Sequence, residues 1–225
     1  MLDILFLSKK KFAQILRSYS RESLLSKKEL KRFESLVSPS RKKDWLAGRI
    51  AAKWLLSSWL KSHFAISLEP NKIEILNNKD GVPKLKLLYR KGLLPTVSLS
   101  ISHENGLAVS AVALNGKVGV DLAKGRSIKK EHQQYYLNNK EQEEAVTHFG
   151  VEGPLLYWTI KEAYLKALEE GFMHSVASVS LQYKTKAKLF QLRDKKRPGI
   201  ITDISYQKIG TTFISAVFLG NEAAV

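Results

Sequence analysis

The stretch YWTIKEAYLKALEEG, Tyr157 to Gly171, has the spacing of a helix that is apolar around most of its circumference. Its polar side chains gather in one narrow stripe, namely Thr159, Glu162, Lys166, Glu169 and Glu170. Lys161 falls outside this stripe, between leucines. A lysine in an apolar arc either extends its amine to water or meets an anion. The narrow stripe favours a helix that lines a cleft, and Lys161 is a candidate for a role there.

The composition limits the class of protein. The chain has 225 residues, of which 44% are hydrophobic, which suits one large domain or two small ones. Lysine and arginine outnumber the acids 37 to 21, and this excess favours nucleic acid, anionic lipid, phosphorylated ligands or acidic proteins as partners. The chain has no cysteine, no apolar run long enough to span a membrane and no signal-peptide pattern at its start. We therefore expect a cytoplasmic protein without a membrane partner.

The periodicity changes twice along the chain. Helical spacing is predicted over 26–37, over 40–64 with Ser40 as the N-cap, and over 140–171. Strand-like runs are predicted over 72–76, 83–89, 96–102, 107–114 and 117–123, as a meander, and again over 178–184, 188–193 and 211–220. This order predicts two α+β halves, 1–114 and 115–225.

Two acids are candidates for chemistry in the second half. Asp121 in GVDLAKG follows an apolar run, where a carboxylate either binds a cation or caps a turn. Glu162 and Lys166 are four residues apart and share a helix face, so they form either a surface ion pair or a functional pair in a cleft.

The first half offers candidates for anion binding. Ser102 and His103 end a strand-like run, but neighbours on a strand point to opposite faces and cannot form a nucleophile and base pair. The histidine belongs to a turn or binds phosphate. Arg49 and Lys53 lie one helical turn apart, an unfavourable pair unless an anion lies between them.

Taken together, these motifs resemble the 4′-phosphopantetheinyl transferases of the long, two-lobed Sfp-like type. The stretch WTIKEAYLK carries most of the resemblance, and GVDLA and ISH support it in the same order along the chain. The resemblance implies two similar α+β subdomains arranged as a pseudo-dimer in one chain, with coenzyme A in the cleft between them. It also implies transfer of the 4′-phosphopantetheine arm of coenzyme A to a serine of an apo acyl or peptidyl carrier protein, with release of adenosine 3′,5′-bisphosphate.

The resemblance also assigns roles to residues. It implies that Asp121 and Glu162 bind Mg²⁺ and that Lys166 acts on the transferring phosphate. Phosphoryl transfer also needs a group that takes the serine proton, and we expect Glu162 to do this directly or through a metal-bound water. The predicted contacts of coenzyme A are Arg49, Lys53, Ser102, His103, Lys161 and Lys84. We expect a monomer that uses its basic surface to attract acidic carrier proteins and has no nucleic-acid partner.

Three positions depart from the family pattern. The family often has a second acid at Ala123 and a lysine at Val82, where Lys84 could substitute, and Glu104 is an unexpected acid beside a phosphate site. Mg²⁺ tolerates the loss of one carboxylate because it keeps several waters. The alternatives are a degenerate member that binds coenzyme A or a carrier protein without turnover, and a basic nucleic-acid-binding protein.

Overall fold

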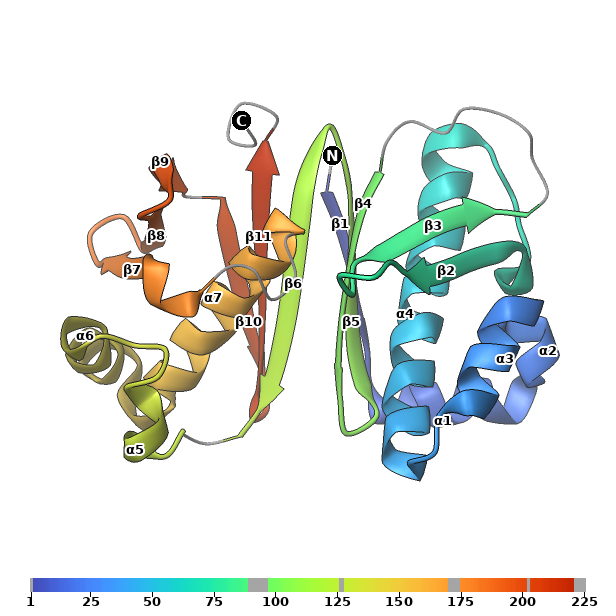
Figure 1. Ribbon diagram of the computed structural model, residues 1–225, viewed down its shortest axis with the longest axis horizontal. Coiled ribbons are helices and arrows are strands. Elements are labelled where there is room, and N and C mark those ends of the chain that lie inside the picture. Colours follow the sequence, from blue (N-terminus) through green and yellow to red (C-terminus); the bar gives the residue numbers. More distant parts are fainter. Residues whose placement is uncertain (1, 89–96, 126–127, 170–174, 202, 221–225) are drawn as a thin grey trace. The chain divides into compact units, whose positions relative to one another are not determined.

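The computed structural model describes residues 2–88, 97–125, 128–169, 175–201 and 203–220 (Figure 1). The chain divides into two compact units, Met1–Asn115 and Gly116–Val225, one residue from the boundary predicted above. Each unit has its own sheet, its own long helix and its own apolar core.

The first unit builds its core around one long helix. Its elements are β1 (Leu2–Leu7), α1 (Lys9–Ser18), α2 (Arg21–Leu24), α3 (Lys27–Ser35), α4 (Pro39–Phe64), β2 (Ile73–Asn77), β3 (Pro83–Leu87), β4 (Val97–Glu104) and β5 (Leu107–Leu114). The antiparallel sheet has the order β1-β5-β4, and β2 and β3 form a separate hairpin. Helix α4 packs on this sheet, mainly on the central strand β5.

The second unit repeats this plan. Its elements are β6 (Gly116–Lys124), α5 (Lys130–Gln133), α6 (Asn139–Phe149), α7 (Gly153–Leu168), β7 (Val179–Lys184), β8 (Leu189–Asp194), β9 (Arg197–Ile201), β10 (Ile204–Ile209) and β11 (Thr212–Gly220). The sheet order is β10-β11-β6, again antiparallel, while β7, β8 and β9 form a second sheet. Helix α7 packs on β6 and β11.

The main sheets of the two units therefore share one plan. In each, a first strand lies beside the last strand, the last strand is central, and the second-last strand lies on its other side. The central strands also share a short sequence: Ser110 is followed by Ala-Val in β5, and Ser215 is followed by Ala-Val in β11. Two similar α+β units in one chain are the fold class predicted from the resemblance.

Some local predictions need correction. Helix α4 begins at Pro39, and its N-cap is Ser38 instead of Ser40, because the Ser38 hydroxyl accepts from Arg41 N. The strand-like runs of the middle stretch are not one meander, since β5 pairs with β1 on its other edge and not with the strand that follows it. The helical stretch predicted over 140–171 is two helices with a break at Gly150–Glu152.

Candidate active site

The site in the second unit depends on a close approach of α7 to β6. A Cβ added at Gly119 would lie 1.8 Å from Ala163 O and 2.4 Å from Ala167 N, so the helix backbone rests directly on this strand position. Asp121 is two residues further along β6 and therefore faces the same side as Gly119. The glycine in GVDLA thus brings the helix down over the strand that carries the aspartate.

Asp121 of β6 meets Glu162 and Lys166 of α7 where the helix approaches the strand. Lys166 Nζ donates to Asp121 Oδ1 at 2.6 Å, and Asp121 is buried while the two helix residues are half-buried. Partial burial and the nearby Asp121 charge raise the pKa of the Glu162 carboxyl, and Lys166 opposes this rise. The structure thus gathers two carboxylates and one ammonium from the three residues predicted to carry the chemistry.

A buried hydroxyl pair lies beside this group. Ser215 on β11 pairs with Asp121 in the strand register, and its Oγ lies 2.7 Å from Thr159 Oγ1 on α7. Both side chains are fully buried, and Thr159 also donates to Leu156 O. Thr159 was predicted as part of the polar stripe, but Ser215 was missed because strand pairing across the unit leaves no local signal in the sequence.

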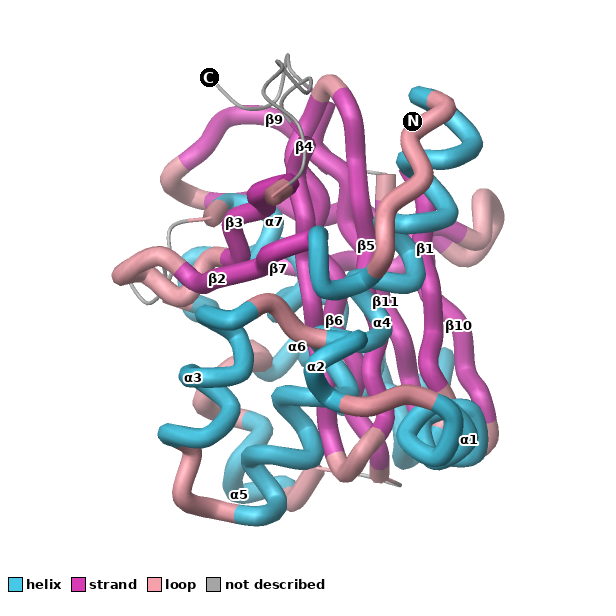
Figure 2. Tube along the Cα trace, turned by 90° about the vertical axis from the view of Figure 1, so that its right-hand side faces the viewer, coloured by secondary structure: helices cyan, strands magenta, loops and turns pink. Residues whose placement is uncertain are grey.

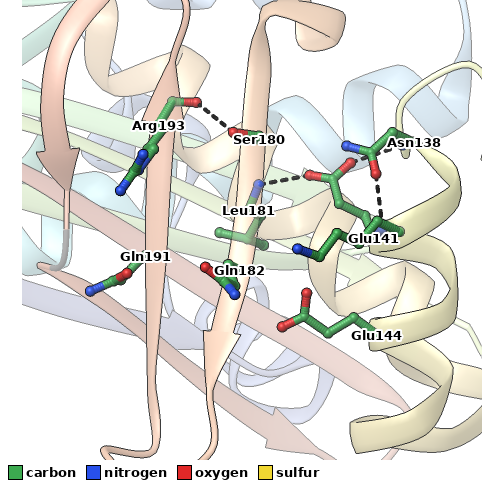
Figure 3. A pocket seen from close by; sticks show the side chains of 9 residues that line it. Asn138, Glu141, Glu144, Ser180, Leu181, Gln182, Gln191 and Arg193 are labelled. Atoms are coloured by element: carbon green, nitrogen blue, oxygen red, sulfur yellow. Dashed lines mark hydrogen bonds between the residues drawn. The ribbon is translucent and has the colours of Figure 1, made fainter.

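Lys161 is buried in the second unit. Its side chain is 1% exposed, and Nζ donates to Glu141 Oε2 and to Tyr136 O, both at 2.8 Å. Glu141 also accepts from the backbone N–H groups of Asn138 and Leu181, which ties α6, α7 and β7 together (Figure 3). Burial lowers the pKa of Lys161, and Glu141 opposes this. The anion that this lysine meets is therefore an internal carboxylate.

Glu141 also lines a polar hollow of about 230 Å³ at the edge of β7 (Figure 3). Glu144 lines it too and accepts from Tyr183 N at 2.7 Å, one alternation along the strand from Leu181. Two acids from α6 thus accept hydrogen bonds from backbone N–H groups at this edge of β7. These groups are then not available for pairing with another strand.

Lys53 repeats this arrangement in the first unit. It is 0% exposed, and Nζ donates to Glu29 Oε2 at 2.6 Å and to the carbonyls of Pro70 and Ile73. Glu29, like Glu141, closes a capping box at the start of its helix and accepts from a strand, here Ile75 N. The Lys53 ammonium thus donates to three acceptors within the first unit.

Arg49 also lies near Glu29. Its Nε lies 3.9 Å from Glu29 Oε1, Nη2 donates to Asn77 Oδ1 at 2.6 Å, and the guanidinium lies over the Trp45 ring. Burial lowers the pKa of Arg49 to about 10. The anion predicted between Arg49 and Lys53 is therefore present, but it is the side chain of Glu29.

The remaining predicted ligand contacts also lie on the first unit. Ser102 is buried and His103 exposed at the end of β4, as the alternation of a strand requires. A Cβ added at Gly48 on α4 would lie 2.7 Å from His103 Cδ2, so the histidine ring lies against this helix. Lys84 is exposed on β3. Ser102 and His103 are adjacent residues of β4. Arg49 and Lys53 both lie near Glu29.

The donor set of the acid site is small. Among the residues that the structure describes, no three or more histidine, cysteine, aspartate or glutamate side chains gather where a metal could bind. Ala123, where the family often has an acid, is half-buried and packs against the core of the second unit. Asp121 and Glu162 are the two described carboxylates that meet at this site. Val82, where the family often has a lysine, is buried in the first unit.

Comparisons with known proteins agree on one family. A family profile described as the 4′-phosphopantetheinyl transferase superfamily matches residues 117–213. The holo-[acyl-carrier-protein] synthase of Lactococcus lactis subsp. cremoris is 37% identical over 93 residues, which cover 41% of this chain and 76% of that protein. The 4′-phosphopantetheinyl transferase HetI of Nostoc sp. is 28% identical over 160 residues, covering 65% of this chain and 60% of that protein.

A solved structure is also similar. The holo-(acyl-carrier-protein) synthase from Bacillus anthracis, in complex with CoA (3′,5′-ADP), aligns with a TM-score of 0.40 and 26% identity over 50% of this chain and 93% of that one. Separately, no helix within the described ranges is both long and apolar enough to cross a membrane.

Proposed function

The chain belongs to the 4′-phosphopantetheinyl transferase superfamily, and we propose that Asp121, Glu162 and Lys166 form the centre at which it transfers the phosphopantetheine arm of coenzyme A to a carrier protein. The observation that carries this assignment is the cluster of two carboxylates and an ammonium under α7. Phosphoryl transfer depends mainly on positioning and on neutralising charge, and this cluster offers groups for both.

In the proposed reaction, the serine oxygen of the carrier protein attacks the phosphorus that bears the pantetheine arm. A new P–O bond forms to the serine, the bond to the bridging oxygen of the pyrophosphate breaks, and adenosine 3′,5′-bisphosphate leaves. Glu162 accepts the serine proton, directly or through a water. Lys166 neutralises charge that develops on the phosphate oxygens.

Asp121 and Glu162 fit a divalent cation that prefers oxygen ligands. Their mutual repulsion contributes to the raised pKa of Glu162, so a cation held by these two carboxylates would relieve an electrostatic cost. Mg²⁺ binds through one or two carboxylates and keeps several waters, which matches a site without an acid at Ala123. When bound, the metal supplies further charge neutralisation for the pyrophosphate.

Ser102, His103 and Lys84 remain the proposed contacts of coenzyme A. A histidine and a lysine at exposed positions can donate to the phosphate groups of a ligand. Lys53 and Lys161 are better explained as buried supports, since each is held by an internal glutamate. Arg49 is largely buried by Glu29, Asn77 and Trp45.

The test is a transfer assay with coenzyme A, Mg²⁺ and a panel of apo carrier proteins, read as the added mass of the arm. Asp121→Ala and Glu162→Ala are expected to abolish transfer, and Lys166→Ala to slow turnover more than it weakens binding of coenzyme A. Ala123→Glu is expected to keep or tighten Mg²⁺ binding, because a third carboxylate only replaces a water.

Glu143→Gln, on the exposed face of α6, is the control and should transfer like the wild type. Near-wild-type transfer by both the Asp121 and the Glu162 variants would remove the site assignment. Calorimetric binding of coenzyme A without transfer to any carrier protein would instead point to a member that binds without turnover.

A further inference from the structure

A hydrogen bond between two buried hydroxyl groups joins helix α7 to strand β11. Thr159 Oγ1 lies 2.7 Å from Ser215 Oγ, and both side chains are 0% exposed. Thr159 donates its one hydroxyl proton to Leu156 O at 2.8 Å, so Ser215 is the donor to Thr159 Oγ1. We call Thr159 and Ser215 the hydroxyl pair.

The hydroxyl pair lies at the level of Asp121 in the sheet. Strands β6 and β11 are neighbours (Figure 2), and Ser215 is the residue of β11 directly opposite Asp121. Opposite residues of an antiparallel pair point to the same face of the sheet, with Cβ atoms about 4.5–5.5 Å apart. Helix α7 packs on both strands. Ser215 therefore holds the helix at the place where the sheet presents Asp121.

On the helix, the hydroxyl pair is one turn away from the other carboxylate of the site. Glu162 follows Thr159 by three residues, so the two side chains are neighbours on one face of α7. Beyond Glu162, the backbone of Ala163 and Ala167 rests on Gly119, where an added Cβ would lie 1.8 Å from Ala163 O. Helix α7 is thus fixed to the sheet by the hydroxyl pair before Glu162 and by Gly119 after it.

The hydrogen bond brings the helix closer to the sheet than apolar packing would. Hydroxyl oxygens joined by a hydrogen bond lie about 2.7–2.8 Å apart, whereas carbon atoms in van der Waals contact lie about 3.5–4.0 Å apart. The 2.7 Å between Thr159 and Ser215 therefore places this part of α7 about 1 Å nearer to β11 than a valine and an alanine would. Glu162, one turn away, takes its position from this contact.

The first unit provides an internal comparison. Its central strand β5 carries Ser110 in the sequence Ser-Ala-Val that it shares with β11, and Ser110 lies opposite Leu5 of β1. The Ser110 hydroxyl is buried without a hydrogen-bond partner among the described residues. The short hydrogen bond is thus present in the unit whose neighbouring strand carries an acid, and Ser110 lacks it in the unit whose neighbouring strand carries a leucine.

The distance between Asp121 and Glu162 matters because the cation proposed for them has strict requirements. Mg²⁺ binds oxygen at about 2.0–2.1 Å in a nearly ideal octahedron, whereas Ca²⁺ accepts oxygen at about 2.3–2.6 Å in a flexible geometry. Two carboxylates on separate elements can both bind Mg²⁺ only if the helix and the strand are held at the matching distance. A helix lifted by about 1 Å would favour the larger cation.

We propose that the hydroxyl pair sets the distance between Glu162 and Asp121 and thereby makes the site selective for Mg²⁺ over larger divalent cations. This rests on the proposed function, which assigns the cation to these two carboxylates. Both hydroxyls are fully buried, so they act through Asp121 and Glu162 and not by contact with a ligand. Thr159 and Ser215 are therefore positioning residues that determine specificity.

The test replaces the hydrogen bond by an apolar contact without leaving an unpaired hydroxyl. Thr159→Val/Ser215→Ala removes both hydroxyls together, which should keep the melting temperature within about 3 °C of the wild type. Titration calorimetry with and without coenzyme A measures the affinity for each cation. The affinity of the double variant for Mg²⁺ should fall by about tenfold or more, and its affinity for Ca²⁺ should change by less than about twofold.

Further variants separate spacing from stability. Thr159→Ser keeps the hydroxyl and should keep the wild-type preference for Mg²⁺, whereas Ser215→Ala alone breaks the same hydrogen bond and should show the selective loss even if the double variant does not fold. Ser110→Ala removes the unpaired hydroxyl of the first unit and should leave both affinities unchanged. A crystal structure of the double variant should show α7 and β11 about 1 Å further apart at residues 159 and 215.

Equal loss of Mg²⁺ and Ca²⁺ binding in the double variant would show general damage to the site and overturn the proposal, as would wild-type affinity for both cations. The readout is cation binding, so it does not depend on turnover. Selective loss of Mg²⁺ binding, in a protein whose wild type modifies no apo carrier protein, would retain the hydroxyl pair and reject the proposed function. Transfer by the wild type, together with unchanged Mg²⁺ binding in the double variant, would do the reverse.

Discussion

Glu162 has to be ionised to accept a proton, yet its surroundings favour the neutral form. Its pKa in the folded state is raised above the ordinary value, mainly by burial and then by Asp121. The native state therefore carries a penalty above that pKa, and the penalty is relieved as the pH falls through it toward 4.5, the ordinary value. The same surroundings that raise the pKa of Glu162 therefore lower the stability of the folded protein at neutral pH.

We expect Glu162→Gln to abolish transfer and to raise the melting temperature at pH 7 in the presence of EDTA. The gain should disappear below pH 4.5, where Glu162 is protonated and therefore as neutral as the glutamine that replaces it. Scanning calorimetry at several pH values measures this, with Glu143→Gln as the control that changes an exposed glutamate. A Glu162→Gln variant less stable than the wild type at pH 7 would contradict the assigned direction.

At the same scale, the sequence predicts some residues of the site and not others. Asp121, Glu162 and Lys166 could be chosen because a motif and an i,i+4 spacing place them together. Glu29 and Glu141 were not predicted as the partners of Lys53 and Lys161. Their signal was present, since each stands three residues after a serine or asparagine cap, but which lysine they meet depends on long-range packing.

Helices α4 and α7 each carry one lysine in a buried ion pair. Replacing such a lysine should lower stability, whereas replacing a ligand contact should weaken binding of coenzyme A. Lys53→Met removes one member of a buried ion pair and leaves Glu29 without its partner, which should lower the free energy of unfolding by about 3–5 kcal/mol. The KM for coenzyme A of the folded protein should not change. Urea unfolding and a transfer assay measure the two quantities.

Lys161→Met is the matched change in the second unit and should cost at least as much, because it removes the ion pair of Glu141, whereas Arg49 stays 3.9 Å from Glu29 in Lys53→Met. If Lys53→Met instead left stability intact and raised the KM for coenzyme A, Lys53 would be a ligand contact and its buried pair with Glu29 would have been misread.

Helix α7 also depends on the absence of a side chain on β6. Gly119→Ala would place a methyl group within 1.8 Å of a backbone oxygen, so the helix must lift from the strand, and we expect a loss of about 3 kcal/mol or more. Lys166 would then move away from Asp121, and transfer should fall with stability. Thermal unfolding and the transfer assay check this.

Gly125→Ala is the control. Apart from the residues next to it in sequence, the nearest atom to the added Cβ would be 3.6 Å away, which is an ordinary van der Waals distance. A Gly119→Ala variant as stable and active as Gly125→Ala would show that the packing of α7 on β6 does not position the site.

Several elements with a clear apolar periodicity were predicted, and three edge strands were not. The run 107–114 was predicted as a strand and is β5 with the same bounds. In contrast, β1, β9 and β10 were not predicted, since a short strand at an edge shows its nature only through its partner. The partner of each strand was the least predictable property, as the pairing of β5 with β1 shows.

For the whole chain, the order of helices and strands predicted two similar halves, although no sequence identity between them was recognised. The structure supplies the correspondence. Lys53 matches Lys161, and Glu29 matches Glu141, which also aligns Ala51 with Thr159, two residues before each lysine. In the register of the sheets, Leu5 opposite Ser110 corresponds to Asp121 opposite Ser215. The same framework thus carries polar groups in one unit and apolar groups in the other.

This correspondence explains a buried serine in the first unit. Ser215 Oγ is bonded to Thr159, whereas Ser110 Oγ is buried without a hydrogen-bond partner among the described residues, and the position that matches Thr159 is Ala51. An unsatisfied buried hydroxyl costs about 1–3 kcal/mol, while a satisfied one contributes about 1 kcal/mol. Ser110 thus keeps a hydroxyl whose counterpart in the second unit is bonded.

The same substitution should therefore have opposite effects in the two units. Ser110→Ala is expected to stabilise the protein by about 1 kcal/mol, because it removes an unpaired hydroxyl and leaves the strand intact. Ser215→Ala is expected to destabilise it by about 1–2 kcal/mol, because Thr159 loses its partner beside Asp121. Ala51→Thr should convert Ser110 from unpaired to paired, so that Ser110→Ala then becomes destabilising in that background. A double-mutant cycle in urea measures the coupling, and additive effects of Ala51→Thr and Ser110→Ala would refute the match between the units at this position.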